Sequence, residues 1–168
     1  RFTWAGKMAK DIGADKIICM GDFASMDSLS SWDRGKKSFQ GRRYRKDIDH
    51  AHQALELFNT DMGNHKAEMH MTLGNHEDRI DRMVEDNPEL EGAISIDDLD
   101  YPSYGWNEYT YRYPVVIDGI HYSHNFPSGL MGSAISGENI ARTLLNKNKV
   151  SSTVGHCHLL DYAIGAYP

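Results

Sequence analysis

The sequence predicts an α/β or α+β sandwich of two mixed β-sheets flanked by helices, in a single domain. Segments with helical spacing of apolar residues alternate with short apolar runs, and polar clusters follow the runs where they end at glycine. The chain has 168 residues, of which 40% are hydrophobic and 25% charged. No apolar run approaches the roughly 18 residues of a membrane span, and only two cysteines occur. We therefore expect a cytoplasmic protein that does not insert into a membrane.

The first half of the chain alternates between the two kinds of element. Apolar residues at steps of three and four predict the first two helices, which are closed by Gly13 and Gly63, and Pro88 follows the third. β-branched or apolar runs predict the strands. In order, we expect a helix over 2–12, a strand over 16–20, a helix over 43–62, a strand over 68–73 and a helix from 77 to about 86.

The second half begins with an acidic, turn-rich stretch at 92–108, which we interpret as a loop. A hairpin follows over 109–124, and its Asp118-Gly119 dipeptide suits a type I′ turn. A short helix over 137–148 and a last strand over 150–158 complete the predicted elements.

Metal-binding side chains follow the predicted strands. In α/β folds the carboxyl ends of strands carry the chemistry, so these side chains are candidates for one shared site. Oxygen and imidazole ligands together suit Mn, Fe or Zn better than Ca or an all-thiolate zinc site. The candidates are Asp22 after "ICMG", Asn75 and His76 after "TLG", His124 at the end of the hairpin, and His156 and His158 after "TVG".

Four short blocks, in this order, carry a family resemblance: "GDFAS", "GNHED", a strand-terminal "HN" and "GHCH". They resemble the calcineurin-like metallophosphoesterase superfamily, whose pattern is Asp-x-His, Gly-Asp, Gly-Asn-His-Asp/Glu, His and Gly-His-x-His. Four of the five blocks are present, and their order across residues 17–158 makes the match specific. The resemblance implies a metallophosphoesterase, a hydrolase acting on phosphoester bonds with two divalent metal ions, Mn being favoured over Fe or Zn.

The resemblance also implies a role for each residue. Asp22 would bridge the two metals, Asn75, His124 and His156 would complete the second metal site, and His158 would bind the first. His76 would be the general acid, a role that suits imidazole because its pKa lies near neutrality. A hydroxide held between the two metals would attack phosphorus in line.

Several residues keep alternative interpretations. Glu77 could orient the catalytic His76 or could simply favour the dipole of the following helix. His121 competes with His124, but it begins its strand beside the turn, so we prefer His124. His156 and His158 would share a face of a strand, which leaves Cys157 on the opposite face.

The first family block, Asp-x-His, is absent from the printed sequence. We expect residues 1–168 to form one metallophosphoesterase domain that is incomplete at both ends. The native polypeptide should then carry, within about twenty residues upstream, a β-branched run ending in Asp-x-His.

The charge distribution leaves the substrate class open. The net charge is −6, yet residues 34–46 hold seven Lys or Arg and no acid. This run favours a phosphodiesterase of the nuclease type acting on nucleic acid or a nucleotide, with Arg42, Arg43, Arg45 and Lys46 as substrate-binding candidates. A solvated basic loop is the competing interpretation. A phosphomonoesterase and a non-catalytic binding module on the same scaffold are the alternative functions.

Overall fold

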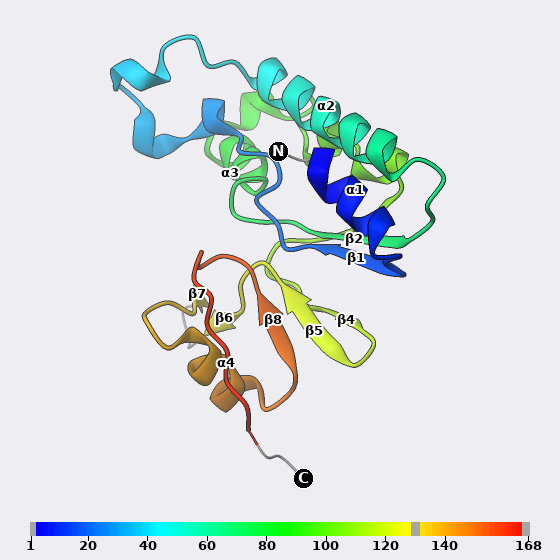
Figure 1. Cartoon of the computed structure of the whole chain (residues 1–168). Coiled ribbons are helices and arrows are strands. Elements are labelled where there is room, and N and C mark those ends of the chain that lie inside the picture. The colour runs from blue at the N-terminus through cyan, green and yellow to red at the C-terminus, as the bar shows by residue number, and fades with distance from the viewer. Residues whose placement is uncertain (1–2, 129–131, 166–168) are drawn as a thin grey trace.

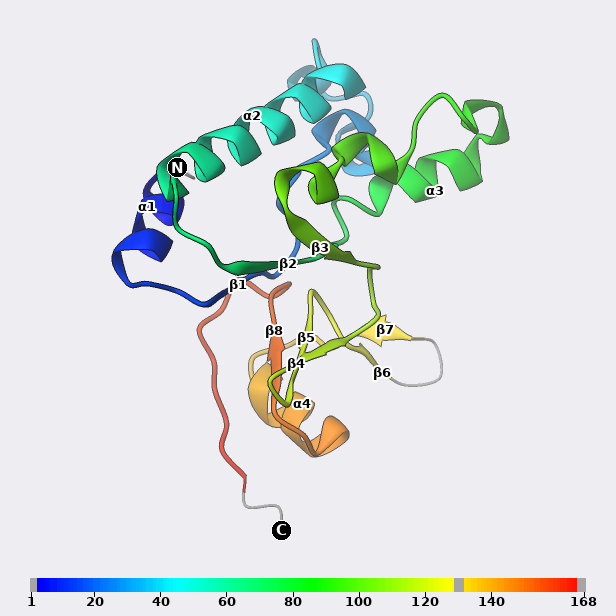
Figure 2. The same ribbon diagram turned by 90° about the vertical axis from the view of Figure 1, so that its right-hand side faces the viewer.

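The computed structural model describes residues 3–128 and 132–165, and it shows an α+β protein with three small sheets (Figure 1). The first sheet contains β1 (Lys16–Cys19), β2 (Glu68–Thr72) and β3 (Trp106–Tyr109) in that order, and all three strands run parallel. Helices α1 (Thr3–Asp11) and α2 (Tyr44–Met62) cover one face of this sheet, while the second sheet lies on its other side (Figures 1 and 2).

The main core lies between α2 and the first sheet. The buried side of α2 presents residues spaced by three and four positions, as an amphipathic helix should, and they are Ile48, Ala51, Leu55, Phe58 and Met62. Met69 and Met71 of β2 are buried against the same cluster. Helix α3 (Arg79–Asp86) starts after the β2 exit, and α1 packs on α2.

The second sheet contains β4 (Val115–Ile117), β5 (Ile120–Ser123) and β8 (Ser152–Val154). Strands β4 and β5 form an antiparallel hairpin, and β8 pairs with β5 in parallel. Asp118 and Gly119 have φ values of 50° and 80°, so the predicted type I′ turn is confirmed. Helix α4 (Ile140–Asn148) packs beside β8, and a third sheet pairs β6 (Pro127–Ser128) with β7 (Ser133–Ala134).

The predicted α+β class and most predicted elements are confirmed. The helix expected over 2–12 is α1, although its first residue, Phe2, lies outside the described residues. The prediction of two mixed sheets was wrong, because the first sheet is wholly parallel and a third, two-stranded sheet is present. Among the described residues, no helix has both the length and the apolar character that crossing a membrane requires.

Three further expectations need correction. The hairpin expected over 109–124 is shorter, because β4 begins only at Val115 and Tyr109 belongs to β3 of the first sheet. The stretch 92–108 is not a plain loop, because it holds 3-10 turns at Ile96–Leu99 and Tyr101–Tyr104 and then most of β3. The last strand was expected to reach residue 158, but β8 ends at Val154 and the chain turns directly after it.

Candidate metal centre

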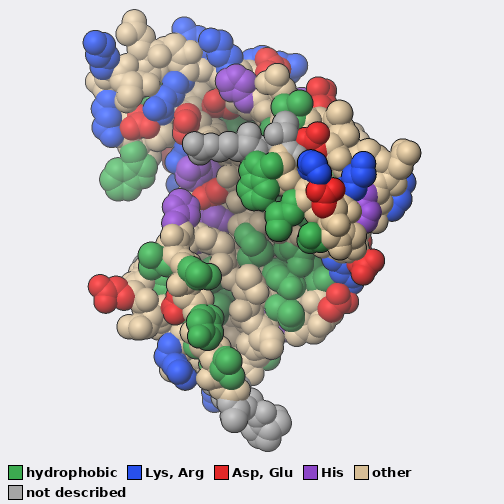
Figure 3. All heavy atoms as spheres, viewed as in Figure 1, with side chains coloured by type: hydrophobic (Ala, Val, Ile, Leu, Met, Phe, Trp, Pro, Cys, Tyr) green, Lys and Arg blue, Asp and Glu red, His purple; other side chains and the backbone are tan. Residues whose placement is uncertain are grey.

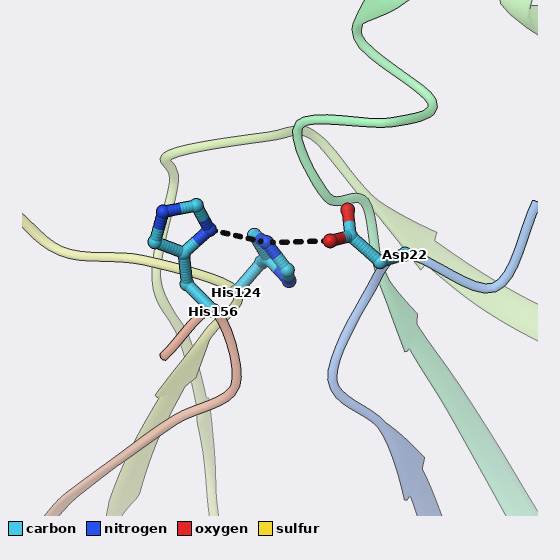
Figure 4. Close-up of side chains that lie close together, drawn as sticks. All are labelled: Asp22, His124 and His156. Atoms are coloured by element: carbon cyan, nitrogen blue, oxygen red, sulfur yellow. Dashed lines mark hydrogen bonds and ion pairs between the residues drawn. The ribbon is translucent and has the colours of Figure 1, made fainter. Parts of the chain in front are cut away.

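Four side chains meet where the carboxyl ends of the strands of the two larger sheets come together. Asp22 and Asn75 follow β1 and β2, whereas His124 and His156 follow β5 and β8. The His124 Nε2 atom lies 3.0 Å from Asn75 Oδ1, 3.1 Å from His156 Nδ1 and 3.4 Å from Asp22 Oδ2. Figure 4 shows the imidazole of His124 between the other histidine and the carboxylate. We call these four residues the metal cluster.

The environment of His124 determines which of its ring nitrogens is free to bind a metal. His124 is 2% exposed, and its Nδ1 lies 2.7 Å from the backbone oxygen of Met20. A carbonyl oxygen can only accept, so Nδ1 carries the hydrogen and, in the neutral ring, Nε2 presents a lone pair to the cluster. A hydrogen bond from the second ring nitrogen to a backbone carbonyl is the usual support of a metal-binding histidine.

Asp22 is held in an uncommon backbone conformation with one oxygen already used. Its φ is 54°, in the left-handed region that few residues other than glycine adopt. The backbone amide of His76 donates to Asp22 Oδ1 at 3.0 Å, which leaves Oδ2 directed toward His124. Strained conformations of this kind persist where the surrounding structure fixes them, often at functional sites.

Two glycines allow the exits of β1 and β2 to approach one another. A Cβ atom on Gly74 would lie 2.4 Å from the backbone nitrogen of Asp22, and one on Gly21 would lie 2.9 Å from Gly74 Cα. Contacts this short with backbone atoms cannot be relieved by rotating a side chain. The glycine before each motif is therefore required for Asp22 and Asn75 to come together.

Glu77 joins the same two loops from inside the protein. Its carboxylate is 0% exposed and accepts hydrogen bonds from the backbone amides of Asp22, Ala24 and Gly74 at 3.0, 2.8 and 2.8 Å. The Tyr101 hydroxyl lies 3.3 Å from the same carboxylate. Burial raises the pKa of Glu77, although its backbone hydrogen bonds oppose the shift. The side chain is thus occupied by loop amides, and α3 begins only at Arg79.

The His76 side chain lies between the metal cluster and the solvent. Its ring is 31% exposed, and Nε2 lies 3.8 Å from Asp22 Oδ2. Burial lowers the pKa of His76, and the nearby Arg79 lowers it further, whereas Asp22 raises it. The ring is therefore accessible to a group placed over the cluster, and the general-acid role of His76 stays a prediction.

His156 and His158 do not occupy equivalent positions. Both lie beyond the end of β8, so the alternation of a strand does not place them on one face. The backbone amide of His156 donates to the His124 carbonyl at 2.9 Å, which fixes its loop against the β5 exit. His158 is exposed and, among the described residues, the group of ligand atoms within 4.8 Å contains Asp22, His124 and His156 without it.

The cluster fits one cation by its chemistry and its spacing. It presents a carboxylate oxygen, an amide oxygen and two imidazole nitrogens, a mixed set that suits Mn, Fe or Zn. Two ligands bonded to one ion at about 2.1 Å lie roughly 3.0–3.4 Å apart, depending on the coordination angle. The His124 Nε2 distances of 3.0, 3.1 and 3.4 Å fall in this range.

Some of the basic residues of 34–46 that the sequence suggested for substrate binding already form ion pairs or hydrogen bonds within the protein. Arg42 binds Asp33 at 2.7 Å and the Asp27 carbonyl at 3.0 Å, while Arg45 pairs with Asp49 on α2 at 3.0 Å. Arg43 and Lys46 are exposed. In the space-filling view, Lys and Arg gather over the segment between β1 and α2, above a hollow where histidines are visible (Figure 3).

Sequence reasoning missed the residues that support the cluster from behind. Asn125, which is 1% exposed, donates to the Tyr111 hydroxyl at 2.7 Å, and the Tyr111 ring lies 6.2 Å from that of His124. The only sequence signal for Asn125 was its place directly after His124 in the "HN" pair, and no role was assigned to it. Cys157 contacts the Ile135 carbonyl in a small separate core and, as expected, is not part of the cluster.

Comparisons of this chain with models of protein families, with curated proteins and with solved structures each found no match. Any functional assignment therefore depends on the motifs and on the geometry of the metal cluster.

Proposed function

We propose that the chain is a metal-dependent phosphoester hydrolase of the metallophosphoesterase type, and more specifically a phosphodiesterase with nuclease-type activity. The observation that supports this best is the convergence of Asp22, Asn75, His124 and His156 from the exits of four strands in two sheets. The acceptor atoms face one another with little else to satisfy them, and a divalent cation is the partner that suits all four.

Each residue then has a definite task. Asp22, Asn75, His124 and His156 hold a divalent ion, with Mn favoured, and the Met20 carbonyl keeps the His124 lone pair directed at it. A bound ion supplies Lewis acidity toward the phosphoryl oxygens and makes water easier to deprotonate. His76 holds a proton at the solvent side for the leaving oxygen. Glu77 positions the loops that carry Asp22 and Asn75.

Metal binding and turnover test this proposal separately. Titration calorimetry with Mn²⁺ should show one firm site in the wild type, and Asp22→Asn should lose it. Mn-dependent turnover is then compared between a chromogenic phosphodiester and the corresponding monoester. Faster diester cleavage supports the phosphodiesterase, and faster monoester cleavage would move the proposal to a phosphomonoesterase. Absence of Mn²⁺ binding in the folded wild type would refute the metal site.

One observation favours the binding module as a second candidate. The family's other metal would take Asp22 and His158 from this chain, and His158 is exposed and outside the cluster. A single firmly bound ion with no turnover of either ester, measured on protein that includes any upstream residues, would favour this candidate over the enzyme.

A further inference from the structure

A cavity of about 240 Å³ opens directly beside the metal cluster, because Asn75 lines it as well. Its other walls come from the segment after β1, from α3 and its approach, and from the connection between β3 and β4. They carry the indole of Trp32, four arginines and two carboxylates: Arg34, Arg79, Arg82, Arg112, Asp78 and Asp86. Pockets that enclose a whole drug-sized ligand are typically about 300–1,000 Å³. The cavity is therefore suited to one unit of a longer ligand whose neighbouring group lies at the cluster.

Two of the cavity's arginines are available for an anion. Arg79 donates to the Ser25 carbonyl at 2.8 Å, and Arg82 binds Asp78 and the Asn75 carbonyl, each at 2.9 Å, so these two guanidinium groups already have partners. Among the described residues, the partner of Arg34 is the weakly accepting sulfur of Met83, at 3.5 Å. Arg112 lies over its neighbour's aromatic ring at 5.2 Å. Within the described part of the chain, neither Arg34 nor Arg112 is paired with a carboxylate.

Aromatic rings accompany these two cations. Trp32 lines the cavity and is 83% exposed, so its indole is accessible to a ligand in the cavity. Tyr111 is held by the buried Asn125 and is the ring over which Arg112 lies. Exposed aromatic rings combined with free guanidinium groups are the means by which proteins bind single-stranded nucleic acid, through base stacking and phosphate contacts.

We propose that this cavity is the subsite for the nucleotide next to the reacting phosphate, and that the substrate is a single-stranded nucleic acid. The unpaired base stacks on Trp32, and its phosphate lies between Arg34 and Arg112. A duplex would keep its bases paired and away from the indole. This inference builds on the proposed function, but it relocates the nucleic-acid contact from Arg42, Arg43, Arg45 and Lys46 to a different set of residues.

Binding can be measured without turnover, by following tryptophan fluorescence as tetradeoxythymidylate is added in EDTA. We expect quenching on binding, and Trp32→Leu should remove most of it. Affinity, measured for every variant by titration calorimetry with the same oligonucleotide, should fall in Trp32→Leu by about 5- to 150-fold, the usual range for losing one stacked base. Trp4 is the matched control, because it is 62% exposed on α1, and Trp4→Leu should leave affinity unchanged.

The two arginines are tested as a pair against a second pair of exposed cations. Arg34→Gln with Arg112→Gln should weaken binding at least about tenfold and reduce the salt slope by about 0.7, because both arginines contact the same phosphate and each single-strand phosphate contact contributes about 0.7. Arg43→Gln with Lys46→Gln should change affinity less than twofold. Circular dichroism confirms that each variant is folded.

The outcomes separate this inference from the proposed function. Mn²⁺ binding to the cluster without oligonucleotide binding would overturn the subsite and leave the hydrolase proposal standing. Oligonucleotide binding at the cavity in a protein that binds no Mn²⁺ would leave nucleic-acid binding at the cavity standing and overturn the hydrolase proposal. Inorganic phosphate that competes as strongly as the oligonucleotide, or a second pair of variants that weakens binding as much as the first, would overturn the nucleotide assignment.

Discussion

Replacing Glu77 by glutamine tests whether this buried carboxylate holds the loops of the metal cluster in place. One of its oxygens accepts from Ala24 N and Tyr101 Oη, and the other accepts from Asp22 N and Gly74 N. Glutamine has only one acceptor oxygen, so its NH₂ group must face at least one backbone amide, donor against donor. The best orientation sacrifices the Ala24 bond, because the Tyr101 hydroxyl can rotate to accept.

The magnitude follows from this geometry. Losing a hydrogen bond to a charged acceptor costs about 1.5–3 kcal/mol, and leaving the partner buried and unpaired adds about 1–3 kcal/mol. Removing the buried charge offsets part of the loss, since burial raises the pKa of Glu77. We therefore expect Glu77→Gln to lower the free energy of unfolding by ~2–4 kcal/mol and to weaken Mn²⁺ binding.

Urea denaturation followed by circular dichroism measures the first effect, and titration calorimetry with Mn²⁺ measures the second. Glu85→Gln is the matched control, because Glu85 is an exposed carboxylate on α3 and its replacement should change stability by less than about 0.5 kcal/mol. If Glu77→Gln is as mild as this control in both assays, the carboxylate does not organise the two loops.

Three further substitutions address the cluster and its surroundings. Gly74→Ala should abolish Mn²⁺ binding, because the new Cβ would lie 2.4 Å from Asp22 N and separate the loops, as calorimetry can show. His76→Ala should keep Mn²⁺ binding but slow diester turnover by about 10²–10⁴-fold, most for poor leaving groups. Arg42→Gln should lower the urea midpoint at pH 7 but not at acid pH. Its ion pair holds the pKa of Asp33 below the ordinary value, so the stabilisation is present above about pH 4 and is lost as the pH falls through the lowered pKa of Asp33.

Each of these variants has a control in the same chain. Gly41→Ala introduces a side chain at a φ of 84° with no atom within 4 Å, so it should be strained without affecting the metal. His50→Ala on α2 should leave turnover unchanged. Arg45→Gln breaks only an exposed pair and should shift the midpoint little. Loss of Mn²⁺ in the His76 variant would make that residue a ligand, and an equal effect of Arg42→Gln at both pH values would exclude the ion pair.

The strand exits could be predicted because apolar runs that stop at glycine are a local signal. Asp22 and Asn75 follow such runs, and the strands before them were placed within one residue. The end of β8 carried the same signal, since Gly155 follows Val154, but the predicted strand continued past it to residue 158. A Cβ on Gly155 would lie 2.6 Å from the Met20 carbonyl oxygen, so this glycine lies closely against the exit of β1, a contact that the local sequence does not reveal.

Other features depended on partners distant in sequence. Strand β3 has a short aromatic and polar sequence, and it is defined by its parallel pairing with β2. Residues 34–46 contain no acidic residue, so the sequence suggested that Arg42 has no carboxylate partner. In the structure it forms an ion pair with Asp33, which directly precedes this run. The role of Glu77 likewise depends on amides more than fifty positions away, at Asp22 and Ala24.

The division of the metal cluster between two sheets has a consequence for stability. Asp22 and Asn75 belong to one sheet and His124 and His156 to the other, so a bound ion would cross-link segments separated by most of the chain. A covalent cross-link that closes a loop of about 100 residues is worth roughly 4–5 kcal/mol through the entropy of the unfolded chain, and a tightly held ion acts in the same sense. The stabilisation grows with the logarithm of the free metal concentration. The supply of metal would then determine how strongly the two sheets are held together, so that chelation would loosen the fold at the metal cluster.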